Sequence, residues 1–319
     1  ILNIIQSRAF EYVINGDRSM GEKAVSSLRN FVNTVVFDFS NDQSYNYFGE
    51  AEYVIGCVYD WCYDLLDDKD KKLFRNAVIK YASHKIGYPP TKMGAVTGHG
   101  TEGPLMRDLL APAIAMYDEY PSIYENAAGR LYSEYVPAKK FLYRAHMSEM
   151  QGQGYTNYRE KWAAYTLYLM DAIGEKNIFG EDMEYAYHWL LYARRPDGAL
   201  LYDGDSNGES ESYHLYATYP DLPMLLANYY GNPYIKWEYL RQQYDSISKM
   251  VSNQSVNCTT MFICNKRMEA KSPEELPLSH YFAEPKGGYI ARTSWNEGYN
   301  ANTVLCEFKI NEYWTSNHQ

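Results

Sequence analysis

The segment Gly98–Pro104 (GHGTEGP) is the first stretch of the chain whose residue types could support chemistry. It places His99 and Glu102 three residues apart, which in a helix would bring both side chains to one face. Three glycines and a proline instead predict a loop that opens a helix. The HExxH spacing of zinc enzymes is absent, so the segment gives little support for a metal site. If the segment has no chemical role, it is a glycine-rich turn that places a carboxylate in the first turn of the following helix.

A second candidate lies in the run Gln151–Arg159 (QGQGYTNYR). Its glycines do not complete a dinucleotide-binding fingerprint, because no strand precedes them and no further glycine follows. Tyr155 and Arg159 are four residues apart at the start of a predicted helix, and are therefore neighbours on one face. A guanidinium beside a phenol favours the phenolate and lowers the pKa of the phenol, which suits an acid–base catalyst. The alternative is a Tyr–Arg stacking pair without a chemical role.

The run Glu312–Gln319 (EYWTSNHQ) supplies a third candidate, His318. A histidine in a polar run after a predicted strand is accessible and titrates near neutral pH, although the run could equally be a plain surface loop. The candidate catalytic residues are therefore His99, Glu102, Tyr155, Arg159 and His318. The candidate substrate-binding residues of the same segments are Gln151, Gln153, Trp314 and Asn317.

The other histidines are assigned structural roles, and the cysteines give no candidate site. The histidines fall within predicted helices or linkers, at His84, His146, His188, His214 and His280. The five cysteines form an odd, sparse set without zinc-ligand spacing, so they predict neither a disulfide framework nor a metal site. No metal ligand is proposed, and no cofactor is expected for catalysis.

These candidates must be positioned by elements whose pattern changes once along the chain. Up to about residue 250, apolar residues recur at three- and four-residue steps, as is typical of amphipathic helices. Asp67 is expected to cap one helix just after another that covers 50–66. Further helices are predicted at 104–119, 122–134, 157–173, 181–194, 210–229 and 233–250. From about residue 255 the pattern alternates, and strands are predicted at 258–265, 287–293 and 303–310. The sequence thus predicts an α+β multidomain protein, helical over 1–254, with the start of an antiparallel β domain at 255–319.

Composition excludes several classes of protein. No run approaches the roughly 18 consecutive apolar residues that span a membrane. The formal net charge of −10 argues against a nucleic-acid partner, because such proteins present a basic face. The 34 tyrosines would suit an aromatic-lined groove for a sugar chain, or half-buried positions on helices. Since the chain starts without Met and ends abruptly, we expect a fragment of a longer protein, of unknown oligomeric state.

In their order, the three segments resemble the heparinase II/III-type family of polysaccharide lyases, in particular its heparinase II branch. GHGTEGP comes first, QGQGYTNYR follows some fifty residues later, and TSNHQ comes after the first predicted strands. The resemblance extends over essentially the whole chain. It implies an incomplete (α/α) helical toroid followed by an antiparallel β-sandwich, with the active site in the cleft between them. It also implies cleavage of uronic-acid glycosaminoglycans, heparin and heparan sulfate first, and a periplasmic or secreted location.

Carried over position by position, the resemblance makes Tyr155 the catalytic tyrosine, with Arg159 beside it. His99 and Glu102 match the pair that meets the uronate carboxylate, and His318 matches the catalytic histidine of the β part. Members of the family also carry a structural zinc in the β domain. Its ligands would follow His318, beyond the last residue of this chain.

Three alternatives remain open. The first is a lyase that acts on alginate or another unsulfated uronate. The second is an α/α-toroid glycoside hydrolase, whose two carboxylates could come from Asp203, Asp205, Glu209 and Glu211. The third is a non-catalytic glycan-binding protein.

An enzyme that acts on a polyanion needs a positive cleft. Despite the net charge of −10, a group of cations would therefore have to gather at the cleft, namely Lys139, Lys140, Arg144, Arg159, Lys161, Arg194 and Arg195.

Overall fold

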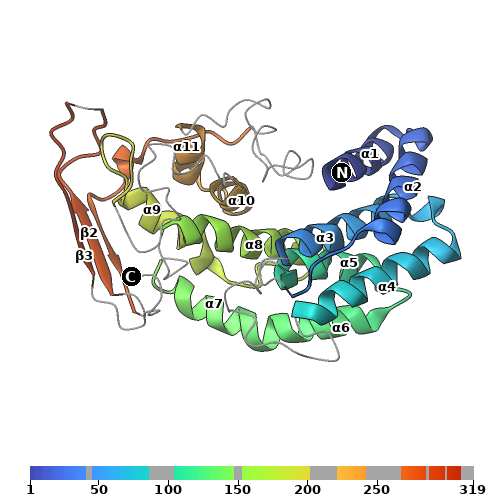
Figure 1. Cartoon of the computed structure of the whole chain (residues 1–319). Coiled ribbons are helices and arrows are strands. Elements are labelled where there is room, and N and C mark those ends of the chain that lie inside the picture. Colours follow the sequence, from blue (N-terminus) through green and yellow to red (C-terminus); the bar gives the residue numbers. More distant parts are fainter. Residues whose placement is uncertain are drawn as a thin grey trace. The chain divides into compact units, whose positions relative to one another are not determined.

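The computed structural model describes residues 1–40, 45–85, 104–146, 153–201, 221–241, 267–284, 287–298 and 300–309 (Figure 1). Over these residues the chain is mostly helical, with one small antiparallel sheet, so the predicted α+β class is confirmed. The chain divides into two compact units, Ile1–Pro137 and Ala138–Gln319. No helix of the described residues is both long enough and apolar enough to cross a membrane.

The first unit is helical throughout its described part. Its elements are α1 (Leu2–Asn15), α2 (Arg18–Thr34), α3 (Tyr45–Trp61), the 3₁₀ turn η1 (Tyr63–Leu65), α4 (Asp68–Lys85), the π-helical η2 (Pro104–Leu109), α5 (Leu110–Ala115), α6 (Pro121–Arg130) and the π-helical η3 (Leu131–Tyr135). The side chain of Asp67 accepts a hydrogen bond from the backbone N–H of Asp70 at 2.8 Å, which confirms the predicted cap of α4. Asp17 caps α2 in the same way through the N–H of Met20.

Helix α3 forms the centre of the first unit. It packs against α1, α4, α5 and η2, and Val54, Ile55 and Val58 are fully buried. Most residues of α3 are apolar, as expected of a helix that packs against several neighbours. Gly56 lets α5 approach closely, because a Cβ at this position would lie 2.8 Å from the backbone nitrogen of Pro112.

Glu52 of α3 is a buried carboxyl group whose two oxygens make no hydrogen bond within the described part of the chain. Burial, followed by the negative charge of Asp108, raises its pKa well above the ordinary value of 4.5. The folded state therefore holds a proton that the unfolded chain releases as the pH rises. Its contribution to stability is complete below about pH 4.5 and is lost as the pH rises towards the folded pKa.

We predict that Glu52→Gln becomes more stable relative to the unchanged protein as the pH rises above about 4.5, because the amide cannot ionise. Urea unfolding midpoints measured between pH 4 and pH 8 check this difference. Glu22→Gln is the control, since Glu22 lies on the surface of α2 in an exposed pair with Arg18. If the Glu52→Gln and unchanged curves stay parallel across this range, Glu52 does not titrate as described.

The second unit joins helices to a three-stranded sheet. Its helical elements are α7 (Val136–Tyr143, which begins in the first unit), α8 (Gln153–Ala172), the 3₁₀ helix η4 (Glu181–Tyr187), α9 (His188–Tyr192), α10 (Asp221–Tyr230), α11 (Pro233–Arg241) and the 3₁₀ turn η6 (Pro273–Glu275). Helix α10 packs against α8, α11 and η4, and α9 packs against the first strand.

The sheet has the antiparallel order β1-β2-β3, from β1 (Ser279–Phe282), β2 (Gly288–Arg292) and β3 (Leu305–Lys309). Strands β2 and β3 confirm the predictions at 287–293 and 303–310. Strand β1 lies where no strand was predicted, because its four residues are too few to show an alternating pattern. The strand predicted at 258–265 lies outside the described residues.

The two faces of the sheet differ. Phe282 and Ile290 lie on the buried face, where the rings of Phe282 and Trp189 of α9 are 4.6 Å apart. Tyr281, Tyr289 and Phe308 are in register across the three strands on the other face and are exposed.

Other tyrosines lie in the cores of the two units, and the fully buried ones include Tyr59, Tyr135, Tyr143, Tyr187 and Tyr192. Part of the tyrosine excess thus serves packing rather than a groove.

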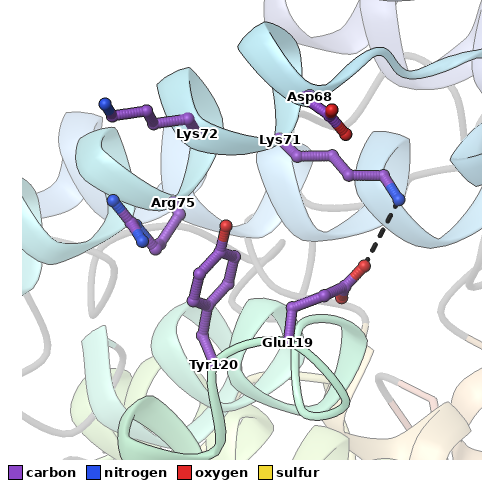
Figure 2. A pocket seen from close by; sticks show the side chains of 6 residues that line it. All are labelled: Asp68, Lys71, Lys72, Arg75, Glu119 and Tyr120. Atoms are coloured by element: carbon purple, nitrogen blue, oxygen red, sulfur yellow. Dashed lines mark hydrogen bonds and ion pairs between the residues drawn. The ribbon is translucent and has the colours of Figure 1, made fainter.

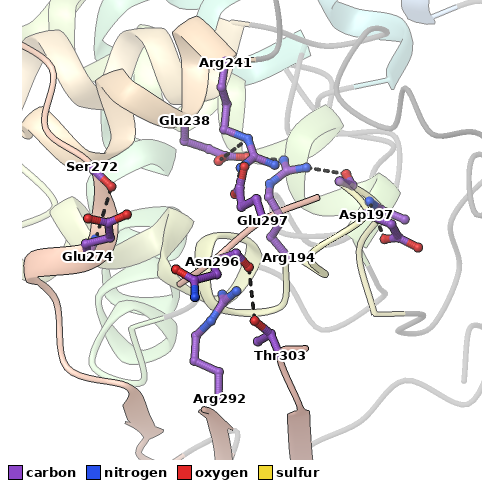
Figure 3. Close-up of polar contacts among 12 residues, drawn as sticks. Arg194, Asp197, Glu238, Arg241, Ser272, Glu274, Arg292, Asn296, Glu297 and Thr303 are labelled. Atoms are coloured by element: carbon purple, nitrogen blue, oxygen red, sulfur yellow. Dashed lines mark hydrogen bonds and ion pairs between the residues drawn. The ribbon is translucent and has the colours of Figure 1, made fainter. Parts of the chain in front are cut away.

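An ion-pair network centred on Glu238 of α11 holds together distant segments of the second unit. Arg194, after α9, donates to the fully buried Glu238 carboxylate, and Arg241 lies 3.3 Å from it (Figure 3). Arg241 also pairs with Glu297, in the connection between β2 and β3. Arg292 of β2 lies close to this network. Burial, followed by the positive charge of Arg241, lowers the pKa of Arg292 to about 10.

Candidate functional site

Helix α8 carries the part of the predicted site that the structure describes. Gln153 and Tyr155 lie in its first turn, and Arg159 is buried one turn later. Because the helix is continuous from Gln153 to Ala172, residues 155 and 159 share one face, as predicted. The other candidates lie outside the described residues, namely His99, Glu102, Gln151, Trp314, Asn317 and His318.

A buried polar cluster fixes α8 to α7 next to this face. Lys139 of α7 donates from Nζ to Oε1 of Glu160, and Tyr143 of α7 donates its hydroxyl to Oε2 of Glu160 at 2.6 Å. All three side chains are almost completely buried. Buried charges are tolerated when they are paired and hydrogen-bonded, and this cluster meets both conditions. Glu160 lies 17 positions after Tyr143 and 21 positions after Lys139 in the sequence.

The π-helical segment η2 begins at Pro104, the last residue of the glycine-rich motif that holds His99 and Glu102. Its Arg107 is buried and donates to Glu50 of α3 at 2.6 Å and to Asp108 at 2.8 Å. The guanidinium also lies over the ring of Tyr53, 4.1 Å from its centroid. π-Helical turns occur frequently at functional sites. This one is fixed to the central helix of the first unit by charged contacts.

The structure brings together three histidines that sequence analysis treated as separate structural residues. His146 follows α7, His188 begins α9, and His280 lies in β1. Nδ1 of His146 is 2.9 Å from Nε2 of His280, and the rings of His188 and His280 are 5.5 Å apart. Nδ1 of His188 is buried and has no hydrogen-bond partner among the residues that the structure describes. No local sequence pattern could have predicted this cluster, because His188 follows His146 by 42 positions and His280 follows His188 by 92.

Burial keeps this histidine cluster (His146, His188 and His280) neutral. It lowers the pKa of His188 to about 3, with smaller effects from the charges of His280 and His146. Burial and His146 lower the pKa of His280 to about 4. The pKa of His146 is also lowered by burial, against an opposing effect of Asp182 in η4. Since an unfolded histidine binds its proton near pH 6.5, the stability present at neutral pH is lost as the pH falls towards 3–4.

We predict that His188→Phe weakens the acid sensitivity of the second unit. Between about pH 6 and pH 4, His188 alone should change the unfolding equilibrium about tenfold per pH unit, because the unfolded chain binds a proton that the folded chain rejects. Chemical unfolding at several pH values measures this slope. Tyr185→Phe is the control, since Tyr185 contacts the rings of His146 and His188 but does not titrate in acid. An unchanged slope in His188→Phe would contradict the prediction.

The first unit contains an open pocket of about 640 Å³ between α4 and the turn that follows α5 (Figure 2). It is lined by Asp68, Lys71, Lys72, Arg75, Glu119 and Tyr120. Lys71 lies 3.3 Å from Glu119, and the Arg75 guanidinium lies 4.4 Å from the ring centroid of Tyr120. Burial would raise the pKa of Glu119, but hydrogen bonds from Tyr63 and Lys71 outweigh it and lower the pKa. The two carboxylates offset much of the positive charge of the pocket.

Three of the cations expected to gather in a cleft are instead paired with carboxylates. Lys139 pairs with Glu160, Arg194 with Glu238, and Arg195 with Asp197. The side chains of the first two pairs are buried. These pairings could not be seen in the sequence, and the gathering of the cations at a cleft stays a prediction.

Within the described ranges, no group of three or more His, Cys, Asp or Glu side chains is arranged to hold a metal ion. Comparison of the chain with protein-family models and with curated proteins gives no match.

Proposed function

We propose that the chain belongs to a polysaccharide lyase that cleaves uronic-acid glycosaminoglycans, heparin and heparan sulfate first, by β-elimination. The observation that supports this most directly is the position of Tyr155 and Arg159 one turn apart at the start of α8. The proposal also rests on the resemblance of the three ordered motifs. It includes the finer architecture, an incomplete (α/α) toroid followed by a β-sandwich, and a periplasmic or secreted location.

The reaction removes the proton on C5 of a uronate and expels the oxygen on C4. The C5 proton is weakly acidic until the charge of the neighbouring carboxylate is neutralised. A protonated Glu102, with His99 as a second donor, would hold that carboxylate and stabilise the enolate-like intermediate. Glu102 can donate only if burial or the charge of the substrate raises its pKa.

Tyr155 would carry the proton. As a phenolate favoured by Arg159, it takes the C5 proton, and the C5–H electron pair forms the C4–C5 double bond as the C4–O bond breaks. The phenol then returns a proton to the leaving oxygen. His318 would act as base from the opposite face of the sugar, so that glucuronate and its C5 epimer iduronate could both react. Gln151, Gln153, Trp314 and Asn317 would contact the chain on either side of the bond.

The product of elimination provides the test. The new C4–C5 double bond is conjugated to the carboxylate and absorbs ultraviolet light, whereas hydrolysis and binding create no such bond. We expect absorbance to increase when the protein is incubated with heparan sulfate or heparin. An increase with alginate alone would favour the unsulfated-uronate alternative. New reducing ends without absorbance would indicate a hydrolase, and binding without either change would indicate a glycan-binding protein. The lyase proposal is wrong if heparin, heparan sulfate, alginate and chondroitin all give no unsaturated product.

A further inference from the structure

We propose that the open pocket between α4 and the turn after α5 is a binding site for a sugar that carries a carboxylate (Figure 2). Lys72 and Arg75 bind the carboxylate of the sugar. Asp68 and Glu119 accept hydrogen bonds from its hydroxyls. The pocket lies wholly within the first unit, and the described residues that line it include none of the proposed catalytic residues. The proposal therefore goes beyond the lyase function and does not depend on it.

Lys72 and Arg75 form the cationic side of the pocket. They lie three residues apart in α4 and are therefore neighbours on one face of the helix. In the described part of the chain, no ion pair joins either side chain to a carboxylate. The Arg75 guanidinium donates from Nε and Nη2 to Oδ1 of Asn76, at 3.1 and 2.9 Å, but this amide carries no charge. Both positive charges are therefore available to an anion.

Arg75 is oriented for a carboxylate. Its guanidinium carbon lies 4.4 Å from the ring centroid of Tyr120, and this stacking fixes the plane of the guanidinium. Because Asn76 occupies the edge formed by Nε and Nη2, the edge formed by Nη1 and Nη2 remains for a ligand. Two parallel hydrogen bonds from such an edge match the two oxygens of a carboxylate. Lys72 adds a point charge beside them.

Asp68 and Glu119 form the acceptor side of the pocket, across the Tyr120 hydroxyl from the two cations (Figure 2). Tyr63 and Lys71 both donate to Oε1 of Glu119, which holds the carboxylate in place. A carboxylate can accept about four hydrogen bonds, so Glu119 retains capacity for hydroxyl donors. Asp68 lies in the first turn of α4 and is exposed to solvent.

The charge and the size of the pocket fit such a ligand. Its three cations exceed its two carboxylates by one positive charge, which matches a single carboxylate on the ligand. The volume of about 640 Å³ lies within the range of about 300–1,000 Å³ that is typical of small-molecule sites. An apolar ligand is disfavoured, because five of the six lining side chains are charged. A sugar with a carboxylate offers an anion to the cations and hydroxyl donors to the carboxylates.

Binding of glucuronate to the whole chain tests the proposal. Glucuronate has a carboxylate and hydroxyls but no glycosidic bond, so its binding does not require lyase activity. Amide shifts in ¹H–¹⁵N spectra give dissociation constants for glucuronate, for glucose, which lacks the carboxylate, and for acetate, which lacks the hydroxyls. We expect glucuronate to bind about tenfold more tightly than either, because a hydrogen bond to a charged group contributes about this factor.

Variants of the cationic side locate the binding. Lys72→Gln and Arg75→Gln should each weaken glucuronate binding by about tenfold, because each removes a charge-assisted hydrogen bond. Lys69→Gln is the matched control, since Lys69 lies in the same helix and is exposed but does not line the pocket. It should bind glucuronate as the unchanged protein does. Thermal unfolding verifies that the three variants are folded.

Three results would overturn the proposal. Glucuronate could bind no more tightly than acetate or glucose. Its binding could be the same in Lys72→Gln and Arg75→Gln as in the unchanged protein, which would place it elsewhere. Lys69→Gln could weaken it as much as the two pocket variants do, which would indicate a general effect of charge. The lyase function is tested separately, because absence of unsaturated product would remove that function whether or not glucuronate binds here.

Discussion

Replacing Tyr155 with phenylalanine is expected to lower the rate of uronate elimination by about 10²–10⁴-fold with little change in stability. The substitution removes the hydroxyl that carries the proton, while the ring that remains has nearly the same shape. Initial rates of ultraviolet absorbance with heparan sulfate measure the effect on kcat, and thermal unfolding verifies the fold. The loss should appear with glucuronate and with iduronate, because the same phenol protonates the leaving oxygen in both cases.

Tyr168→Phe is the matched control for this experiment. Tyr168 is on the same helix, but its hydroxyl donates to the backbone of α10, three turns and more beyond Tyr155. It should keep a rate close to that of the unchanged protein. Substantial elimination activity in Tyr155→Phe would exclude Tyr155 as the proton carrier and would remove the main support for the mechanism.

The second large effect concerns the ion-pair network of the second unit. Glu238→Leu should lower the free energy of unfolding by about 3–5 kcal/mol, because Arg194 and Arg241 would lose the carboxylate that lies between them. Arg292, close by, would add a further uncompensated charge. Urea unfolding gives this difference as a shift of the transition midpoint with an unchanged slope.

Glu275→Gln gives the comparison for an exposed pair in the same unit. Glu275 lies 3.7 Å from Lys271, and both side chains are at least half exposed, so this change should cost about 0–1 kcal/mol. Equal, small losses in the two variants would show that water or a neighbouring group compensates the arginines when Glu238 is absent.

Features with a local cause were predictable from the sequence. The cap at Asp67 depends on one side chain and the N–H three residues later, and the structure contains it. Strands β2 and β3 show alternation over five residues each, and Gly287 directly precedes β2. The shared helical face of residues 155 and 159 follows from the helix period alone. Each of these depends on neighbours within a few positions.

Features that depend on tertiary packing were not predictable. The pairing of Lys139 with Glu160 was missed because the two residues lie on different helices, and a sequence does not show which faces of α7 and α8 meet. The histidine cluster was missed for the same reason, since its members come from the turn after α7, the start of α9 and strand β1. Strand β1 is four residues long and becomes a strand by pairing with β2. The His99, Glu102 and His318 assignments remain predictions, because these residues lie outside the described ranges.

The close approach of α3 and α5 at Gly56 limits how this protein can vary over evolutionary time. A side chain at position 56 would meet the backbone of Pro112, and backbone atoms cannot rotate away as a side chain would. Related chains that keep this crossing should therefore retain glycine here, or change α5 at the same time. Around Gly129 in α6, the described residues place no atom within 4 Å of a Cβ built there, apart from the nearby backbone of α6 itself, so related chains are free to differ at this position. An alignment of relatives should therefore show glycine retained at position 56 and other residues accepted at position 129.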